Sequence, residues 1–383
     1  MNASQDEFSV RGSFRLVDDL AAEISEELTT EFSNVVLVYP QQPLLQATVN
    51  EVIATLSTYY KVSALEIPDG ESGKSLSICE KIWQHLEDQQ SNRRTLLIGI
   101  GGGAVLDVAG FAASTFMRGI AFWSIPTTLL SMVDAGIGGK TAINFSGFKN
   151  HVGTFTHPSK IWICPKVLSC LPETEMLNGW AECVKHGLLE GEELWEKCKN
   201  QIPPVQPHTL ISFWKPFIEQ QAMFKAQIVE QDFKENGLRE TLNAGHTVAH
   251  ALESYCAKYN LPIAHGTAVA WGLLIESEAA PWHSTLSNNS LEKTSMSIKN
   301  AHYEDWIQTL QYLVTTQYPS LQIANHHTLE SAIEEILEFA TSDKKNHHGK
   351  IVGSVVESPG ICKIQTPLNK SALQSLLSKY LQA

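Results

Sequence analysis

Residues 95–115 read TLLIGIGGGAVLDVAGFAAST, and the fold prediction starts from them. Positions 95–100 are apolar almost throughout, as expected for a strand that is covered on both faces. Glycines follow at 101–103, and 104–116 carries helical spacing. Glycines at such a turn let the backbone approach a ligand, and the amino terminus of a helix offers free N–H groups to a phosphate. The stretch therefore predicts a strand, an anion-binding turn and a helix.

The same alternation extends on both sides of this stretch, across the first 165 residues. Further strand candidates are 34–39, 61–67, 121–126 and 160–164, and helical spacing also occupies 44–60 and 72–90. Buried strands that alternate with helices are typical of a parallel sheet. We therefore predict a two-domain protein whose N-terminal domain, residues 1–170, is α/β with a parallel Rossmann-like sheet.

The character of the chain changes after Pro172. Long helical patterns cover 173–189, 209–232, 242–257, 267–282, 303–317 and 328–341, while 283–299 is expected to be a loop or a fraying helix end. We predict a mainly α-helical domain over residues 171–383. Two-domain enzymes of this kind usually have their active site in the cleft between the domains.

Composition excludes several classes of protein. The 383 residues include 28 Lys+Arg and 41 Asp+Glu, and a net charge of −13 argues against binding to nucleic acid or anionic membranes. The seven cysteines form no C-x-x-C pair, which indicates reduced thiols. With no secretory signal and no apolar run of about 18 residues, we expect a cytoplasmic protein.

Two glycine-containing segments favour dinucleotide binding without proving it. Residues 99–104 satisfy G-x-G-x-x-G/A, a weak pattern by itself, and no acidic residue about twenty positions later fits the ribose role. In 68–75, PDGESGKS, the side chains of Asp69, Glu71 and Lys74 suit ribose hydroxyls and a phosphate. A packing turn in the first segment and a capped, solvated turn in the second stay open as alternatives.

A third segment gathers polar residues that suit an anion. It contains Thr127, Thr128, Asp134, Lys140, Asn144, Lys149 and Asn150. Lys140 follows paired glycines, a common way to present an ammonium group to phosphate oxygens, but GIGGKT lacks the spacing of a P-loop. We predict an anion site, with a plain surface loop as the alternative.

Charged residues and histidines in the helical half suggest a metal site. Glu182 and Lys185 lie one helical turn apart among apolar neighbours, which indicates a site or an intrahelical ion pair. His246 and His250 are four apart and point to one helical face, and His265 precedes another apolar helix. Spacing alone therefore nominates these three histidines as a zinc site.

Six segments together resemble the 3-dehydroquinate synthases, within the wider family of sugar-phosphate cyclases. They are GGGAVLDVAGFAASTFMRG (101–119), IPTTLLSMVDAGIGGKTAIN (125–144), GWAECVKHGLL (179–189), LNAGHTVAHALE (242–253), AHGTAVAWG (264–272) and SDKKN (342–346), in the family's order and at nearly its spacing. The resemblance covers about residues 60–355. It implies an NAD-binding α/β domain, a helical metal-binding domain, a homodimer and a small-molecule sugar-phosphate substrate.

The resemblance also implies a role for each matching residue. It implies that Glu182, His246 and His265 bind Zn²⁺ or Co²⁺, so that His250 contacts the substrate instead. The implied catalytic residues are Asp134, Lys140, Lys185 and His250. The implied substrate-binding residues are Arg118 of the neighbouring subunit, Asn150, Lys225, Arg239, Asn243, and Lys344 or Lys345. The implied NAD-binding residues are Asp69, Glu71, Lys74, Gly103, Ala104, Val105, Asp107, Thr127, Thr128, Lys140 and Lys149.

The reaction that the resemblance implies is a phosphate-eliminating cyclisation, EC 4.2.3.4. In it, 3-deoxy-D-arabino-heptulosonate 7-phosphate becomes 3-dehydroquinate and phosphate, in the shikimate route to aromatic amino acids. NAD oxidises the substrate transiently, phosphate is eliminated, the hydride returns, and the ring opens and closes by an aldol step. One departure from many relatives is the segment at Tyr39 and Pro40, which lacks the Asp expected for the adenosine ribose.

Three other functions compete with this one. A related cyclase would act on a sugar phosphate without a carboxylate, for which Lys225 and Arg239 have little use. A metal-dependent polyol or alcohol dehydrogenase would change the oxidation state of its substrate overall. A non-catalytic relative would bind ligand without turnover, although the intact set of predicted metal ligands argues against it.

Overall fold

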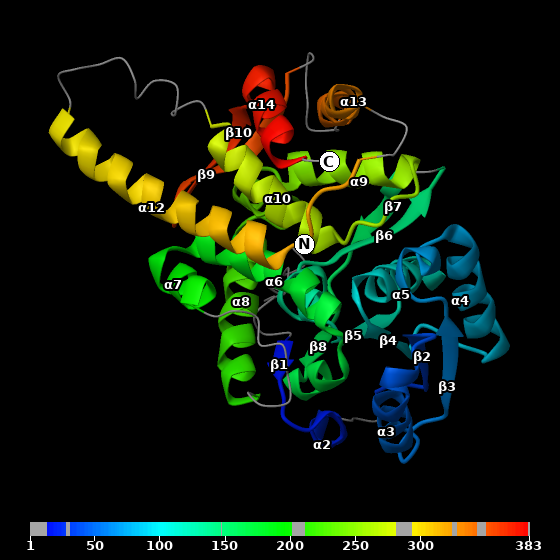
Figure 1. The fold of residues 1–383 in the computed structure, drawn as a ribbon. Coiled ribbons are helices and arrows are strands. Elements are labelled where there is room, and N and C mark those ends of the chain that lie inside the picture. Colours follow the sequence, from blue (N-terminus) through cyan, green and yellow to red (C-terminus); the bar gives the residue numbers. More distant parts are fainter. Residues whose placement is uncertain are drawn as a thin grey trace, which may run out of the picture. The chain divides into compact units, whose positions relative to one another are not determined.

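The computed structural model describes residues 14–27, 31–146, 148–200, 211–280, 293–323, 328–342 and 350–381 (Figure 1). The chain divides into two compact units. Unit 1 contains Met1–Met176 and Val205–Lys234, and unit 2 contains Leu177–Pro204 and Glu235–Ala383. The division differs from the boundary expected at residue 170, because the segment that includes α8 (Ile211–Gln231) belongs to unit 1. The predicted two-part organisation, with an α/β part and a helical part, is confirmed.

Unit 1 contains a six-stranded sheet in the order β1–β8–β5–β4–β2–β3, in which every neighbouring pair is parallel. The strands are β1 (Phe14–Leu16), β2 (Asn34–Pro40), β3 (Val62–Ile67), β4 (Thr95–Gly101), β5 (Ala121–Pro126) and β8 (Lys160–Ile163). The five predicted strands are confirmed. The sequence did not reveal β1, since three residues are too few to show a pattern.

The sheet explains why its strands are apolar on both faces. Val36 and Val38 of β2 join a buried cluster with α4 (Leu76–Asp88) and α5 (Gly103–Thr115). Val35 and Leu37 alternate with them toward the opposite face, and all four side chains are fully buried. Two further helices, α2 (Leu20–Glu27) and α3 (Gln46–Leu56), pack against each other.

The strand order has a switch point between β2 and β4. The chain leaves β2 toward β3 on one side and leaves β4 toward β5 on the other, and open α/β sheets bind ligands at the carboxyl ends of strands at such a point. The glycine turn at 101–103 directly follows β4. The fold therefore brings the predicted anion-binding turn to the edge of the sheet where such folds bind ligands.

Unit 1 also contains short elements that the sequence did not reveal. The strands β6 (Lys140–Phe145) and β7 (Phe148–Phe155) form an antiparallel hairpin, and η4 (Ser131–Ala135) is a turn of π-helix. The remaining 3₁₀ turns are η1 (Pro43–Leu45), η2 (Gly70–Gly73), η3 (Phe116–Arg118) and η5 (Pro165–Cys170). The helix α8 packs on η4 and η5, which explains its place in unit 1.

The described part of unit 2 is mainly helical, as predicted, and contains an antiparallel hairpin. The hairpin consists of β9 (Val352–Ser358) and β10 (Ile361–Pro367). The helices are α6 (Glu173–Glu190, which begins in unit 1), α7 (Glu192–Asn200), α9 (His246–Lys258), α10 (His265–Glu278), α12 (Lys293–Gln317), α13 (Leu329–Ser342) and α14 (Lys370–Tyr380), with a 3₁₀ turn, η7 (Leu238–Asn243). None of the helices in the described part of the chain is long and apolar enough to cross a membrane.

Of the two expectations for 283–299, a loop or a fraying helix end, the loop is wrong from Lys293 onward, where α12 (Lys293–Gln317) begins. Ser and Thr lower helix propensity by less than about 1 kcal/mol per residue, and a helix that is already nucleated extends at that small cost. The expected residues before Lys293 lie outside the described ones.

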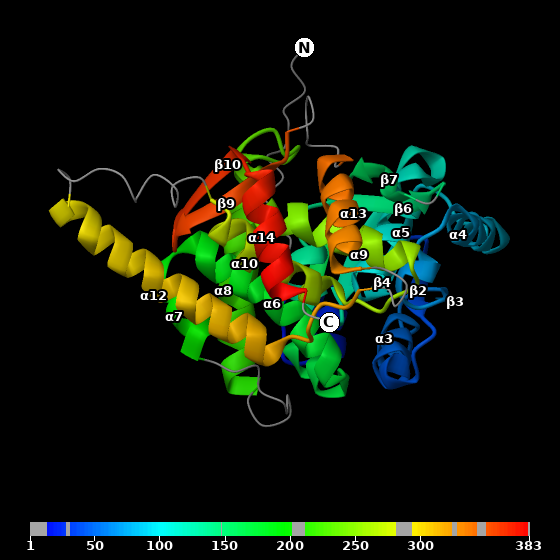
Figure 2. The ribbon, with the colours of Figure 1, turned by 45° about the horizontal axis from the view of Figure 1, so that its top comes forward.

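Close packing of α9 on α10 forms the centre of unit 2. Residues 266–277 of α10 are all buried. Gly245 and Gly272 meet where the two helices cross, and a Cβ atom on Gly272 would lie 2.0 Å from the carbonyl oxygen of Gly245. Figure 2 shows α13 beside α9, and α14 beside α10. This contact between glycines fixes the first residues of α9 and α10, which are His246 and His265.

Candidate active site

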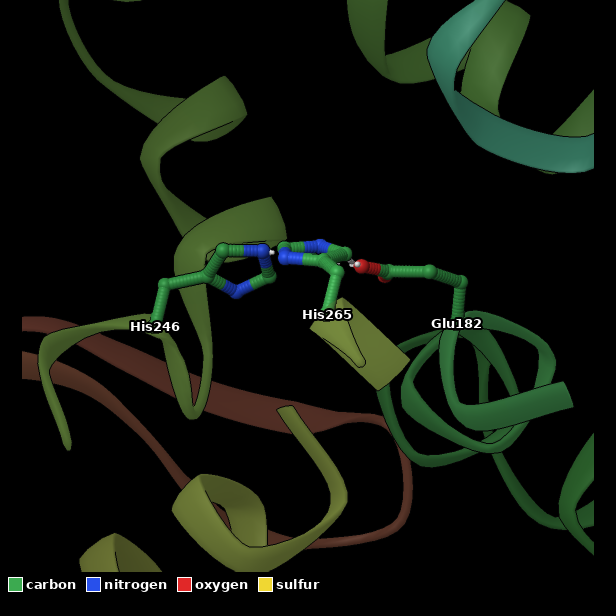
Figure 3. A group of neighbouring side chains, drawn as sticks. All are labelled: Glu182, His246 and His265. Atoms are coloured by element: carbon green, nitrogen blue, oxygen red, sulfur yellow. Dashed lines mark hydrogen bonds and ion pairs between the residues drawn. The ribbon is translucent and has the colours of Figure 1, made fainter. Parts of the chain in front are cut away.

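Three potential metal ligands converge in unit 2 from three helices. Glu182 lies in the middle of α6, while His246 and His265 are the first residues of α9 and α10. Figure 3 shows the three side chains directed toward one another. Oε1 of Glu182 lies 3.1 Å from Nε2 of His265 and 3.6 Å from Nε2 of His246, and one donor atom from each residue falls within 4.8 Å of the others.

The other ring nitrogen of each histidine also faces a partner. Nδ1 of His246 donates a hydrogen bond to the carbonyl oxygen of Ala244, at 3.1 Å. Because a carbonyl oxygen only accepts, Nδ1 carries the proton and the Nε2 lone pair is free. Nδ1 of His265 lies 3.5 Å from Oε1 of Glu253. Both imidazoles therefore direct Nε2 toward Glu182 and Nδ1 toward an oxygen acceptor, so that Nε2 is the nitrogen available to a metal ion that displaces its proton.

Burial and charge separate the two histidines electrostatically. Burial lowers the pKa of His246 to about 4, with a further lowering by Lys185 and an opposing effect of Glu182. Burial also lowers the pKa of His265, but the carboxylates of Glu182 and Glu253 outweigh it and raise that pKa to about 10. A cation is thus favoured beside these carboxylates, whether a proton or a metal ion.

This donor set fits a divalent transition metal. One carboxylate and two imidazoles are ligands that Zn²⁺ and Co²⁺ accept, and three protein ligands leave a coordination position for a substrate. His250 is not part of this group in the described residues, so the three-histidine alternative is not supported. The His250 ring instead lies edge-on to the His246 ring, with centroids 5.5 Å apart.

Three cationic or polar residues predicted to bind substrate also lie in unit 2. Lys185 and Arg239 are 1% and 2% exposed, and the Lys185 ammonium group forms an ion pair with Oε2 of Glu182. The intrahelical ion pair, one of the two alternatives for Glu182 and Lys185, is therefore present. Because the other carboxylate oxygen of Glu182 faces the two imidazoles, the ion pair does not exclude the predicted metal site. Asn243 donates a hydrogen bond from Nδ2 to Oε1 of Glu235, at 2.8 Å.

Sequence reasoning missed Glu235 because no motif includes it. Glu235 has a φ of +61°, which is uncommon for a residue other than glycine, and it lies in the turn before η7. Its proximity to Asn243 depends on how this turn reverses the chain. The only signal in the sequence is an acidic residue four positions before Arg239.

In unit 1, Lys225 and Asp134 form a buried pair. Nζ of Lys225 donates to Oδ1 of Asp134 at 2.7 Å and also to the carbonyl oxygen of Asp134. Lys225 is 6% exposed and comes from α8, whereas Asp134 lies in the π-helical turn η4. A single π-helical turn inside a chain is frequently associated with a functional site.

The glycine turn after β4 leaves the first turn of α5 accessible to a ligand. Gly102 precedes the helix and caps it without a side chain, so that the N–H groups near Gly103, Ala104 and Val105 have no cap from that residue. A Cβ atom on Gly103 would lie 2.9 Å from Cβ of Ala135, so the position requires glycine. This geometry suits a pyrophosphate at the helix amino terminus.

Lys74 and Asp107 form an ion pair beside this turn. Nζ of Lys74 lies 2.5 Å from Oδ2 of Asp107, and the Lys74 side chain is 5% exposed. Burial raises the pKa of Asp107, and Lys74 partly offsets that rise. The lysine predicted to meet a nucleotide phosphate therefore already has an acidic partner.

Asn144 joins two segments that were predicted separately. Its Nδ2 donates to Oε2 of Glu71 at 2.7 Å, and its Oδ1 accepts from the backbone N–H of Asn150 at 3.0 Å. Asp69 accepts from the N–H of Gly70 at 2.8 Å, so it also caps η2, as the alternative held. The residues around 68–75 are thus connected to the β6–β7 hairpin.

The other predicted residues of unit 1 lie at or near the surface, except Thr127. Thr127 is buried at the end of β5, and its N–H donates to the carbonyl oxygen of Gly101 at 3.0 Å. Thr128 bonds Ser131, and Arg118, Lys140 and Lys149 are exposed. Lys344 and Lys345 lie outside the described residues.

Comparison with known sequences decides the family. The 3-dehydroquinate synthase N-terminal family matches residues 64–178, and the 3-dehydroquinate synthase C-terminal family matches residues 179–346. The chain belongs to the 3-dehydroquinate synthase family. The resemblance on which the sequence-based expectation depended is therefore confirmed.

Individual relatives agree with this family. A 3-dehydroquinate synthase of Parabacteroides distasonis is 33% identical over 331 residues, which cover 86% of each chain. One of Chlamydia caviae is 43% identical over 220 residues, which cover 57% of this chain and 56% of that protein. The chain thus spans just over half the length of this Chlamydia relative.

The fold of this chain also resembles that of solved structures. A 2-deoxy-scyllo-inosose synthase, crystallised with carbaglucose-6-phosphate, NAD⁺ and Co²⁺, superimposes with a TM-score of 0.79 over 96% of each chain. The two sequences are 22% identical. This likeness confirms the fold.

Proposed function

We propose that this member of the 3-dehydroquinate synthase family converts 3-deoxy-D-arabino-heptulosonate 7-phosphate to 3-dehydroquinate and phosphate. The observation that carries the proposal is the convergence of Glu182, His246 and His265 in a chain of this family. The reaction forms one carbon–carbon bond and breaks the carbon–oxygen bond to phosphate. Substrate and products have the same overall oxidation state, because the hydride that is removed is returned.

Glu182, His246 and His265 would hold the metal ion, either Zn²⁺ or Co²⁺. When bound, such an ion supplies a Lewis acid for vicinal hydroxyl groups. The carboxylate of Glu182 faces both imidazoles with Oε1 and faces Lys185 with Oε2. Lys185 therefore helps to keep the carboxylate in one orientation, and its ammonium group would contact the substrate.

The first turn of α5 would hold NAD, which supplies a reversible hydride acceptor when bound. The backbone N–H groups at Gly103, Ala104 and Val105 suit the pyrophosphate, and their turn follows β4 at the switch point of the sheet. The other residues proposed for NAD are Asp69, Glu71, Lys74, Asp107, Thr127, Thr128, Lys140 and Lys149.

Buried cations would bind the two anionic groups of the substrate. Lys185 and Arg239 in unit 2, and Lys225 in unit 1, are all at most 6% exposed, in a chain whose net charge is −13. A charge that is shielded from water attracts a carboxylate or phosphate more strongly than an exposed one does. We assign the phosphate and carboxylate of the substrate to these cations together with Asn150 and Asn243.

Two acid–base residues complete the proposed site. His250 lies beside the His246 ring and would contact the substrate, as the resemblance implies. Asp134 accepts a hydrogen bond from the ammonium group of Lys225, so it orients a cation, and it would exchange a proton with bound substrate. The homodimer, with Arg118 reaching the neighbouring subunit, the roles of Lys344 and Lys345, and a cytoplasmic location stay predictions.

Phosphate release tests the proposal directly. Purified protein is incubated with Zn²⁺, NAD and the heptulosonate phosphate, and phosphate and 3-dehydroquinate are measured. We expect one phosphate for each 3-dehydroquinate, no accumulation of NADH, loss of turnover with a chelator, and recovery with Zn²⁺ or Co²⁺. Arg239→Ala should abolish turnover, while Arg93→Ala, at an exposed position, should leave it unchanged.

Two further substrates distinguish the competing functions. Faster phosphate release from a sugar phosphate without a carboxylate would identify a different cyclase. Net NADH formation from a simple alcohol would identify a dehydrogenase. Either result, or no release of phosphate from the heptulosonate phosphate, overturns the proposal.

A further inference from the structure

Glu253 lies beside the metal-ligand group without belonging to it. It is the seventh residue after His246 and the third after His250 on α9, so these side chains share one face of the helix. Its Oε1 lies 3.5 Å from Nδ1 of His265, on the side of the imidazole away from Glu182. The Glu253 side chain is 12% exposed, so the carboxylate is largely removed from solvent.

The two histidines differ in the group behind them. Nδ1 of His246 donates to a neutral backbone carbonyl, whereas Nδ1 of His265 faces a carboxylate. His265 is also the more exposed ligand, with 31% of its side chain accessible against 11% for His246. His265 follows an irregular segment, residues 261–264, so backbone packing constrains its ring less than it constrains that of His246.

A carboxylate behind a metal-binding imidazole has two effects. It accepts the proton on Nδ1, which leaves the Nε2 lone pair for the metal, and it fixes the plane of the ring. His265 needs both effects more than His246 does, because it has less contact with the rest of unit 2. Glu253 supplies them from the helix that carries the other histidine ligand.

We propose that Glu253 is a positioning residue for metal binding, which holds His265 in the tautomer and orientation that bring its Nε2 atom to face Glu182. The inference rests on the proposed metal site and assigns Glu253 no contact with substrate. It links α9 and α10 through the ligands themselves, since Glu253 and His246 come from α9 and His265 from α10.

Metal affinity of the purified protein provides the test. Binding of Zn²⁺ is measured by competition with a chromophoric chelator, and binding of Co²⁺ by its visible absorption, both without substrate or NAD. We expect Glu253→Ala to weaken Zn²⁺ binding by about 10- to 100-fold. Glu253→Gln keeps a carbonyl acceptor for Nδ1 but loses the charge, so we expect a smaller loss and a shifted Co²⁺ spectrum.

Glu335→Ala is the matched control. Glu335 is 14% exposed, lies on α13 in unit 2, and bonds Lys258, the last residue of α9, and Tyr259, which follows it. Its loss removes from α13 a carboxylate of similar burial that contacts the end of α9 but no proposed ligand, so metal affinity should not change. Thermal unfolding of the metal-free variants shows that each one folds.

A double variant separates positioning from a general effect. If Glu253 acts through His265, Glu253→Ala should cost nothing further in a His265→Ala background. Equal losses in both backgrounds, or Zn²⁺ binding by Glu253→Ala and Glu253→Gln at the affinity of the unchanged protein, overturn the inference. Unchanged protein that binds no Zn²⁺ overturns it as well.

The outcome is independent of the assay for turnover. Metal binding that depends on Glu253 in a protein that releases no phosphate refutes the proposed reaction and keeps the inference. Full turnover, together with metal binding that does not depend on Glu253, supports the proposed reaction and refutes the inference.

Discussion

Replacing Gly272 with alanine tests whether the crossing of α9 and α10 sets the separation of the two histidine ligands. The added Cβ atom would lie 2.0 Å from the carbonyl oxygen of Gly245, 2.9 Å from its carbonyl carbon and 3.1 Å from the N atom of Ala249. Real Cβ atoms essentially never approach closer than 3.0 Å, so the two helices must separate by about 1 Å at this point. The obstacle is backbone, which has no rotamer by which to move aside.

Two consequences follow from such a separation. Overpacking a core costs about 1–3 kcal/mol, and the better helix propensity of alanine offsets about 1 kcal/mol of it. Metal binding is more sensitive, because metal–ligand distances tolerate only about 0.2 Å. His246 directly follows Gly245, so we expect Gly272→Ala to weaken Zn²⁺ binding at least about tenfold while unfolding by urea shows only a modest loss of stability.

Leu273→Ala is the control for this experiment. Leu273 is 1% exposed at the same crossing, and its truncation costs about 2–5 kcal/mol by leaving a cavity. A cavity does not force the helices apart, so Zn²⁺ affinity should stay within about threefold despite the larger loss of stability. Wild-type affinity in Gly272→Ala, or an equal loss in Leu273→Ala, would refute the reasoning.

Three further substitutions test other contacts. The buried carboxylate of Glu276 accepts hydrogen bonds from two backbone N–H groups at the start of α9, at 3.1 and 2.7 Å. Glu276→Gln leaves a single acceptor oxygen, and it should lower the free energy of unfolding in urea by about 1–3 kcal/mol. Lys74→Met removes the cation that lowers the pKa of Asp107, a pKa that burial already raises above 3.8. In the variant, the carboxyl group of Asp107 therefore ionises at a lower pH in the unfolded chain than in the folded one, so ionisation at high pH favours unfolding. The loss of stability relative to wild type should be larger at pH 8 than at pH 4, by about 1–3 kcal/mol in urea titrations. Asn144→Ala removes the hydrogen bond to Glu71, and NADH titration by fluorescence should show binding weakened by about fivefold; equal affinity would show that this connection does not organise the NAD site.

Local patterns were sufficient for most of the fold. The five predicted strands and the long helices were visible because apolar periodicity and length are properties of a contiguous segment. The β1 strand, the two hairpins and the π-helical turn were not visible, since they are short and depend on neighbours that are distant in sequence. The affiliation of α8 with unit 1 likewise depends on what it packs against.

The sequence by itself determined the family and the residue types at each candidate position, because each motif is a contiguous segment that can be read directly from the sequence. Only the tertiary structure decided which atoms meet. The spacing of His246 and His250 pointed to a shared ligand role, yet Glu182 is the residue whose oxygen faces His246 and His265, across 83 residues in the case of His265. The glycine crossing positions only the two histidines, and Glu182 comes from a third helix, α6. Long-range contacts of this kind leave no periodic pattern in the sequence.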